Sequence, residues 1–306
     1  MSLITLFIAP KPFTNPHIAT IQWNALRSWQ ELGAEVEILL IGEEAGVPEA
    51  ARELNIRFIS EIARNKEGTP LLSALFNTAR EAGNSPLIGY VNADIILFED
   101  FLETARKASQ MLDQFLLVGQ RWDLDLRERL DFSSGWQARL QADLKERGRL
   151  HPRGGSDYFI YPRSVFTRIP DFAIGRAGWD NWMFYKARRE GWRLVDCTNA
   201  IRIIHQDHDY SHLPNNQPHY RLPETAENVR LAGGKRAIFN LLDCDAQMEQ
   251  GQIRPAPMTW EKLWREVEIF PLIRLRSTWL AQVFFAIFHP IRAYRELRTW
   301  LARRKG

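Results

Sequence analysis

The N-terminal third of the chain alternates short apolar runs with segments of helical hydrophobic spacing. Apolar, β-rich runs predict strands, whereas apolar residues three and four positions apart predict helices. The predicted strands cover residues 3–8, 36–41, 56–59 and 87–91, and the predicted helices cover residues 18–32, 48–54 and 71–81. This alternation is typical of parallel strands joined by crossover helices, so we predict an α/β fold with a doubly wound, mostly parallel sheet and flanking helices.

Beyond residue 117 the pattern is less regular. Residues 121–149 are rich in charge and predict inserted helices and loops. Further strands are predicted at 157–161, 193–196 and 200–204, with a helix at 179–190 between them. Pro255 and Pro257 mark a change toward a helical tail. We therefore predict a main domain over residues 1–240 and a C-terminal helical extension over residues 241–306.

Composition narrows the class of protein. The 306 residues are 45% hydrophobic, which is too apolar for a disordered chain. Two cysteines, Cys197 and Cys244, exclude a disulfide scaffold and favour a reducing compartment. The N-terminal segment has no cationic region and reaches Pro10 before an apolar stretch attains signal or membrane-spanning length. We therefore predict a cytoplasmic protein.

Charge is balanced overall but uneven along the chain. The net charge of +3 is too small for a general nucleic-acid binder, so no nucleic-acid partner is expected. Residues 271–306, however, hold eight Arg or Lys residues against the single acid Glu296. The same tail contains the longest apolar stretch, residues 279–288, which is about half the length of a spanning helix. Two interpretations stay open: this helix packs on the body, or it lies on an anionic membrane surface, which would make the protein peripheral at the inner face.

The first candidate site follows the strand at 87–91. Ligands of doubly wound sheets bind beyond the carboxyl ends of the strands, and Asn92-Ala93-Asp94 stands at such an end. A carboxylate there can hold Mg²⁺ or Mn²⁺ together with a diphosphate. An aspartate that caps a turn is the alternative.

The second candidate site is the segment 204–212, which holds three histidines and two aspartates after another β-rich run. Imidazole is a common metal ligand. A metal shared between this segment, through His205, and Asp94 is the simplest interpretation. A separate zinc site or a hydrogen-bonded surface loop are the alternatives.

Two more carboxylates precede or begin predicted elements. Glycines lead into Asp180 at a helix N-terminus, where the residue is either a general base or an N-cap. Asp157 follows Gly154-Gly155, and the nearby Arg153 can face phosphate oxygens. The chain has no GxGxxG after the first strand, no GxxxxGK[ST] and no GxSxG, which argues against dinucleotide-binding Rossmann proteins, P-loop proteins and α/β-hydrolases.

Taken in order, these motifs resemble GT-A-type glycosyltransferases of the kind grouped as family 2, in a little-characterised bacterial and plant branch. The resemblance covers roughly residues 1–235. Its motifs are Ala9-Pro10-Lys11-Pro12-Phe13, Ala63-Arg64-Asn65, Gly68-Thr69-Pro70, Asn92-Ala93-Asp94, Gly155-Ser156-Asp157, Arg163, Gly178-Trp179-Asp180-Asn181-Trp182 and His205.

This resemblance implies a nucleotide-diphosphate-sugar donor, a Mn²⁺ or Mg²⁺ cofactor and a glycan or lipid-linked acceptor. It implies that Asp94 and His205 bind the metal, and that Asp180, with Asp157 as second choice, is the base of an inverting transfer. Asn92 stands where the family has its first aspartate, which puts metal affinity in doubt or leaves Asn92 to contact the ribose. The residues implied to line the nucleotide are Pro10, Lys11, Glu43 and Arg64. A sugar nucleotidyltransferase and a non-catalytic nucleotide-sugar or glycan-binding protein remain the alternatives.

Overall fold

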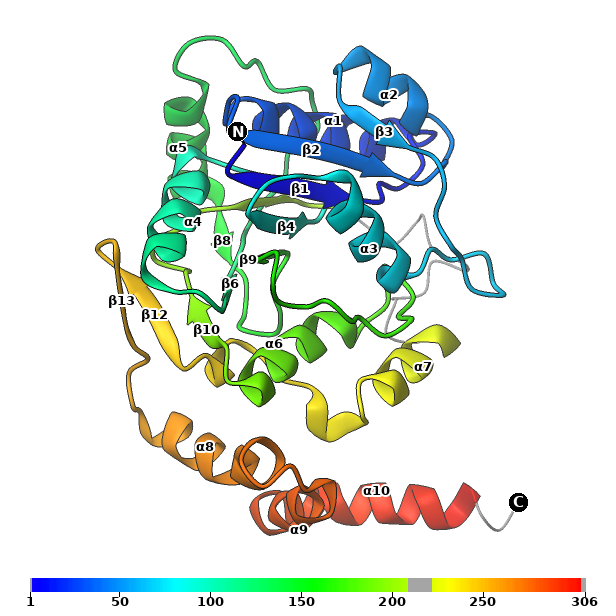
Figure 1. Ribbon diagram of the computed structural model, residues 1–306, viewed down its shortest axis with the longest axis vertical. Helices are drawn as coiled ribbons and strands as arrows, with labels where there is room; N and C mark the ends of the chain where they lie inside the picture. Colours follow the sequence, from blue (N-terminus) through cyan, green and yellow to red (C-terminus); the bar gives the residue numbers. More distant parts are fainter. Residues whose placement is uncertain (1, 209–221, 304–306) are drawn as a thin grey trace.

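A nine-stranded sheet forms the centre of the protein. The computed structural model describes residues 2–208 and 222–303. The strand order is β13-β12-β10-β6-β9-β4-β1-β2-β3 (Figure 1). Pairing is parallel from β4 through β1 and β2 to β3, and from β6 through β10 to β12, whereas β9 and β13 are antiparallel to their neighbours. The bounds are Ile4–Ile8 (β1), Val36–Ile41 (β2), Arg57–Ile59 (β3), Leu87–Val91 (β4), Phe115–Val118 (β6), Tyr158–Pro162 (β9), Arg193–Asp196 (β10), Ala246–Glu249 (β12) and Gln252–Pro255 (β13).

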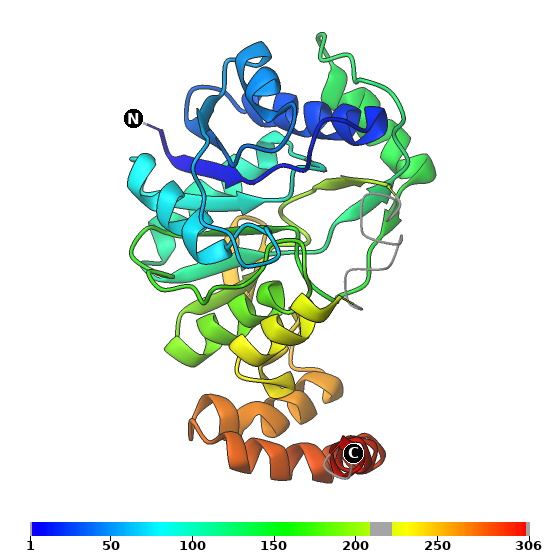
Figure 2. The same ribbon diagram turned by 90° about the vertical axis from the view of Figure 1, so that its right-hand side faces the viewer.

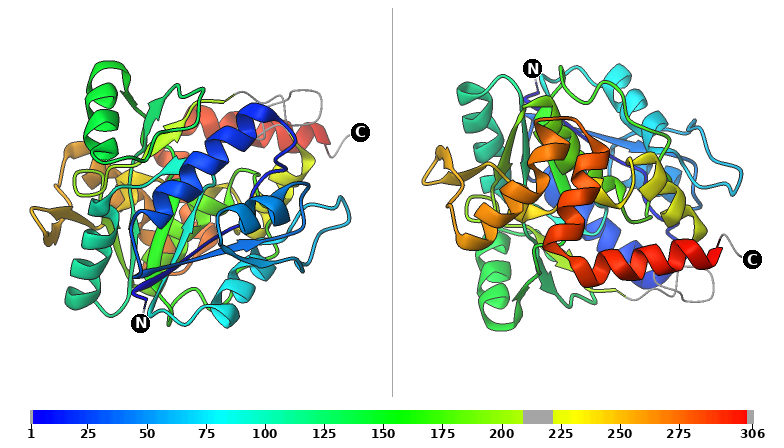
Figure 3. Two further views of the ribbon diagram at one scale, coloured as in Figure 1. Left: turned by 90° about the horizontal axis from the view of Figure 1, so that it is seen from above. Right: turned by 90° about the horizontal axis from the view of Figure 1, so that it is seen from below.

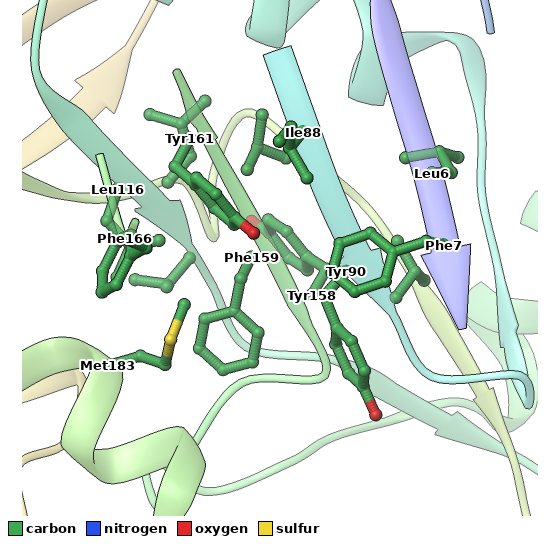
Figure 4. Packing of buried hydrophobic residues seen from close by; sticks show 14 of the residues in the cluster. Leu6, Phe7, Ile88, Tyr90, Leu116, Tyr158, Phe159, Tyr161, Phe166 and Met183 are labelled. Atoms are coloured by element: carbon green, nitrogen blue, oxygen red, sulfur yellow. The ribbon is translucent and has the colours of Figure 1, made fainter. Parts of the chain in front are cut away.

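Helices cover both faces of this sheet, as the doubly wound prediction requires. Tyr158 and Phe159 are neighbours in β9 and therefore point to opposite faces. The ring centroids of Tyr158 and Phe101, which belongs to α4 (Glu99–Met111), are 5.6 Å apart, and those of Phe159 and Phe184, which belongs to α6 (Trp179–Glu190), are 6.2 Å apart. Figure 4 shows Tyr158 and Phe159 among the buried residues. The helices are Pro16–Gln30 (α1), Val47–Glu53 (α2), Leu72–Ala82 (α3), Glu99–Met111 (α4), Trp136–Arg147 (α5), Trp179–Glu190 (α6), Pro223–Leu231 (α7), Trp260–Ile273 (α8), Thr278–Phe288 (α9) and Pro290–Arg303 (α10). The mostly parallel α/β fold predicted from the sequence is confirmed.

A smaller sheet with the order β5-β11-β7-β8 joins segments that are far apart in the sequence. Its strands are Ile95–Ile96 (β5), Trp122–Leu124 (β7), Arg149–Leu150 (β8) and Ile204–Gln206 (β11). In this sheet His205 is opposite Ile95 on one side and Asp123 on the other. The smaller sheet therefore places His205 beside the segment that carries Asp94.

One predicted strand is wrong over most of its length. Residues 200–203 form no strand, and β11 begins only at Ile204. The carbonyl of Cys197 accepts hydrogen bonds from the amides of both Ala200 and Ile201, and Asp100 accepts one from the amide of Arg202. The amides of residues 200–202 thus find their acceptors outside a β-ladder, one of them the side chain of Asp100 from a distant part of the chain.

The helices α8, α9 and α10 lie together at one end of the molecule (Figures 1 and 2). Lys262 of α8 donates hydrogen bonds to the carbonyls of Leu242 and Cys244, both at 2.7 Å, and Glu266 pairs with Arg188 of α6 at 2.8 Å. The domain boundary predicted after residue 240 would assign β12 and β13 to the C-terminal extension, yet both are strands of the main sheet. The purely helical part of the chain begins at α8. No helix in the described part of the chain has the length and apolarity to cross a bilayer.

Candidate active site

A cleft of about 740 Å³ opens beside the ends of β1 and β4. Loops that follow parallel strands meet there, which is where doubly wound sheets bind ligands. The start of β9 reaches the same edge because β9 runs antiparallel to β4. The cleft is lined by these residues predicted from the sequence: Pro10, Lys11, Asn92, Asp94, Asp157, Asp180 and His205.

Asp94, His205 and His208 form a cluster that can hold a metal ion. One ligand atom from each lies within 4.8 Å of the others. Oδ2 of Asp94 is 3.1 Å from Nε2 of His208 and 4.0 Å from Nε2 of His205. The buried Oδ1 of Asp94 has no hydrogen-bond partner among residues 2–208 and 222–303. A buried carboxylate oxygen without a partner is costly, so this atom is suited to bind a cation in the cleft.

The charge of Asp94 is favoured by its neighbours. Burial opposes ionisation, but the hydrogen bond with His208 and the positive charges of His205 and Lys11 outweigh it. The pKa of Asp94 therefore lies well below its usual range. The residue is therefore an anion at neutral pH, which is the form in which an aspartate binds a metal.

Two carboxylates lie behind His205 at ion-pair distance. Its Nδ1 lies 3.3 Å from Oδ1 of Asp123 and 3.8 Å from Oδ1 of Asp207. Burial lowers the pKa of His205, but Asp123, Asp207 and Asp94 together raise it to about 9. Nδ1 makes no hydrogen bond in the described chain, so these carboxylates act on the ring through their charge. With a pKa of about 9 the ring is protonated at neutral pH, and a metal bound at Nε2 would have to displace a proton. Asp123 is itself held by Arg121 at 2.9 Å and by His151 at 2.8 Å.

Lys11 brings a cation to the same place. Its Nζ is 3.7 Å from Oδ2 of Asp94 and 3.2 Å from Nε2 of His208. The buried side chain of Gln22 in α1 fixes the Lys11 backbone, accepting from its amide at 2.7 Å and donating to its carbonyl at 2.9 Å. Burial lowers the pKa of Lys11 although Asp94 opposes the shift.

Asn92 and Asp157 form a second unit, which Arg121 links to Asp123 and so to the metal cluster. Asn92 donates its side-chain amide to Oδ1 of Asp157 at 2.7 Å, and Arg121 binds both oxygens of that carboxylate at 3.0 and 2.9 Å. An aspartate at position 92 would place two carboxylates against each other. The asparagine at this position therefore has a physical reason, since it donates to Asp157 where a carboxylate could not.

Asp180 lies in the wall of the cleft, in the first turn of α6. Burial raises its pKa to about 6, although hydrogen bonds from the amides of Asn181 and Gly178 oppose the shift. The backbone of Gly155 passes so close that a Cβ there would lie 2.6 Å from Oδ2 of Asp180. A carboxyl with a pKa near neutrality can take up a proton from a bound hydroxyl.

Three of the predicted site residues do not line the cleft. Glu43 is exposed, and its neighbour Glu44 lines the cleft instead and pairs with Arg64 at 2.8 Å. Arg64 reaches the site only through that pair. The side chain of Arg153 is exposed outside the cleft.

Sequence reasoning missed several polar residues of the cleft. His208 belongs to the histidine-rich segment 204–212, so the composition of that segment could have indicated it as a metal ligand. Arg121, Asp123 and His151 had none, because β7 and β8 meet β11 only in the folded chain. Residues 209–212 of the histidine-rich segment, which include Asp209 and His212, lie outside the described residues.

No protein-family model matches the chain, and no curated protein matches its sequence. Among solved structures, the chain is similar to the mannosyltransferase PcManGT from Pyrobaculum calidifontis in complex with GDP-Man and Mn²⁺, with a TM-score of 0.42 and 13% identity over 66% of this chain and 56% of that one. It is also similar to TarS 1–349 from S. aureus in complex with UDP-GlcNAc, with a TM-score of 0.48 and 13% identity over 76% and 65% of the two chains.

A third similar structure is glucosyl-3-phosphoglycerate synthase from Mycobacterium tuberculosis with Mn²⁺, UDP and phosphoglyceric acid. Its TM-score is 0.47, and its identity is 15% over 84% of this chain and 88% of that one. The chain spans less than two thirds of the first two proteins. All three of those proteins were determined with a nucleotide or a nucleotide sugar bound.

Proposed function

We propose that the chain is a metal-dependent glycosyltransferase with a GT-A-like fold, which moves a sugar from a nucleotide-diphosphate-sugar donor to an acceptor hydroxyl. The observation that carries this proposal is the presence, in one cleft, of a cation-binding cluster and of a carboxyl with a pKa near neutrality. Sugar transfer needs both: a cation for the leaving diphosphate and a base for the incoming hydroxyl.

The donor atoms of the cluster fit Mn²⁺ or Mg²⁺. Asp94 supplies carboxylate oxygen, and His205 and His208 supply imidazole nitrogen. Carboxylate suits both ions, while imidazole suits the softer transition metals, so Mn²⁺ fits this mixed set better than Mg²⁺. When bound, such an ion would offset the negative charge that develops on a leaving diphosphate.

The residues of the chain supply the remaining steps. The Lys11 ammonium, held at the cleft by Gln22, is placed to bind a phosphate oxygen of the donor. The acceptor oxygen attacks the anomeric carbon while the bond from that carbon to the phosphate oxygen breaks. Asp180 takes the proton of the acceptor hydroxyl, and the nucleoside diphosphate leaves. Attack opposite the leaving group gives inversion.

Asp180 is a better base than Asp157. Both oxygens of Asp157 accept hydrogen bonds from Arg121, and one also accepts from Asn92. Both carboxylate oxygens of Asp157 are therefore already engaged by donors of the protein, whereas no side chain donates to Asp180 in the described chain. We assign Asp157 to holding Arg121 and the cleft wall, and Asp180 to proton transfer.

The acceptor is proposed to be a glycan or a lipid-linked hydroxyl, and the site of action the cytoplasm. Support for a reducing compartment comes from Cys197 and Cys244, which are both buried and free. The near-balanced charge of the chain supports a small-molecule donor and no nucleic-acid partner.

The test is a thermal-shift screen of the full chain with UDP-, GDP- and dTDP-sugars, with and without Mn²⁺, followed by a turnover assay for nucleoside diphosphate release. We expect one donor class to raise the melting temperature only when Mn²⁺ is present, because ligands stabilise the native state by mass action. Release of pyrophosphate from a nucleoside triphosphate and a sugar phosphate would instead indicate a nucleotidyltransferase. Donor binding without turnover on any acceptor or water would indicate a binding protein.

Gly155→Ala is expected to lower turnover through Asp180. The new methyl would lie 2.6 Å from Oδ2 of Asp180, so the carboxylate must move. A displacement of about 1 Å at a reacting group can cost about 10²-fold in rate. The control is Gly154→Ala, since nothing lies within 4 Å of a Cβ at that position. Steady-state kinetics of the two variants make the comparison. Equal rates would show that the position of the Asp180 carboxylate does not matter for the reaction.

Lys11→Met is expected to have opposite effects on metal and donor. The ammonium competes with a metal for Asp94 and His208, so its removal should tighten the binding of Mn²⁺ alone by about tenfold. Donor affinity should fall by a similar factor, because a phosphate contact is lost. Calorimetric titrations with Mn²⁺ and then with donor measure both effects. Lys66→Met, on an exposed side chain, is the control; a variant that weakened both ligands would contradict the competition.

A further inference from the structure

The end of the molecule formed by α8, α9 and α10 carries many exposed apolar side chains. We call it the C-terminal face. Figure 3 (right) shows the three helices on the lower side of the molecule, with α10 running across the direction of α9. Trp260 is 76% exposed, Trp279 72% and Ile291 68%. Large exposed apolar patches on soluble proteins mark sites that bind another surface.

The helices α8 and α9 have apolar side chains on two sides. One side packs on the body of the protein, and the other side is exposed. In α9, Ala281 and Phe285 are buried against the body. Trp279, Val283 and Ile287 follow one another four positions apart and so form an outward stripe. The outward stripe of α8 includes Trp260 and Trp264, while Lys262 and Ile269 point inward.

Two of the helices contact each other through aromatic rings. The ring of the exposed Trp264 in α8 lies 5.8 Å from that of Phe288 in α9, which is half-buried. Tyr294 and Trp300 of α10 are 61% and 48% exposed. Tryptophan and tyrosine are the residues that favour the interface between hydrocarbon and water.

Positive charge accompanies this apolar surface. Among the described residues of α8, α9 and α10, Glu261 is the one acidic residue that is exposed. Their other acids, Glu266, Glu268 and Glu296, are each paired with a basic side chain. The exposed arginines of α10 and of the turn that follows α8 are Arg274, Arg276, Arg292, Arg295 and Arg298.

We propose that the C-terminal face docks on the surface of a bilayer that contains anionic lipids, with its helices lying in the interface. Indole rings and aliphatic side chains enter the headgroup region, and the arginines bind lipid phosphates. A second copy of this chain fits the face less well, since a symmetric contact would bring arginines against arginines. The docked protein keeps its cleft accessible, because among the described residues none beyond position 208 lines it. The inference is independent of sugar transfer.

The test is co-sedimentation of the full chain with vesicles of phosphatidylcholine alone or of phosphatidylcholine with phosphatidylglycerol. Two variants probe the apolar and the charged side chains of the face separately. The apolar variant combines Trp260→Ser, Trp279→Ser and Ile291→Ser, and its control combines Met111→Ser and Leu150→Ser, at side chains that are 38% and 45% exposed elsewhere on the protein. The charge variant combines Arg295→Gln and Arg298→Gln, and its control combines Lys66→Gln and Arg168→Gln, at exposed side chains outside the face. Circular dichroism checks that each variant is folded.

We expect the wild type to bind the anionic vesicles, and to bind them less at high salt. Each face variant should lower the partition coefficient by about tenfold or more, and the controls should not. Absence of wild-type binding to anionic vesicles would overturn the proposal. So would face variants that bind like the wild type, or a wild-type dimer that ignores vesicles and is split by the apolar substitutions.

Discussion

Asp94→Ala is expected to abolish Mn²⁺ binding in the cleft and to lower kcat/KM for sugar transfer by about 10³-fold or more. The reason is that Asp94 is the carboxylate to which both His205 and His208 turn, and it offers a buried oxygen with no partner in the described chain. A metal contributes several kcal/mol to a transition state of this kind, and each 1.36 kcal/mol is about tenfold in rate. Titration with Mn²⁺ and steady-state kinetics measure the two effects.

The control for this substitution is Asp113→Ala, which removes an exposed carboxylate outside the cleft. We expect it to leave both metal binding and rate unchanged. If Asp94→Ala bound Mn²⁺ as the wild type does, the cluster would not be the metal site. If it lost Mn²⁺ but kept its transfer rate, the reaction would not need the metal.

Asp180→Asn is expected to lower turnover by about 10²–10⁴-fold while donor affinity stays the same. The amide keeps the shape of the side chain and can still accept from the amide of Gly178, which the carboxylate now does at 3.3 Å. It cannot take up a proton. Calorimetric titration of the donor and kinetics with acceptor separate binding from turnover; a variant that lost both equally would place Asp180 in donor binding instead.

The pH dependence of the wild type should identify the same group. Burial raises the pKa of Asp180 to about 6, and a base works only when deprotonated. We therefore expect the transfer rate to fall as the pH drops through about 6, and the residual rate of Asp180→Asn to lack this limb. An acidic limb that persisted in the variant would belong to another group.

The substitution Asp180→Asn, which lowers turnover, should raise the free energy of unfolding. The pKa of Asp180 is raised from 3.8 to about 6, so the folded state favours the protonated form. The penalty for the charged form is absent below about pH 4 and complete above about pH 6. Asp180→Asn should therefore be more stable than the wild type by about 3 kcal/mol at neutral pH, with the gain lost in acid. Urea unfolding at both pH values measures it.

The strand ends were the part of the site that the sequence could predict. Asn92, Asp94 and Asp180 each stand next to a clear strand or helix signal, and the ends of parallel strands meet at one edge. The main elements followed for the same reason: periodicity and turn residues are local, and β2, β4 and α6 have the predicted bounds. The proposal for the base and the ligands began from these positions.

The rest depended on contacts between distant segments. Asp123 faces His205 because β7 and β11 pair in register, and no local pattern records that pairing. The choice between Glu43 and Glu44 depends on the turn after β2, where adjacent side chains point in different directions. The tail was ambiguous for a different reason: its apolar helix both packs on the body, through Phe285, and exposes a second stripe.

The central claim is that Asp94, His205 and His208 hold one cation in a cleft that binds an activated sugar. Its most direct test is anomalous diffraction at the manganese edge from crystals of the full chain grown with Mn²⁺ and a nucleoside diphosphate. We predict a single strong peak in the cleft, bonded to Asp94 and to at least one of the two histidines, with the diphosphate on its open side. A peak elsewhere, or no peak between these side chains at saturating Mn²⁺, would contradict the account.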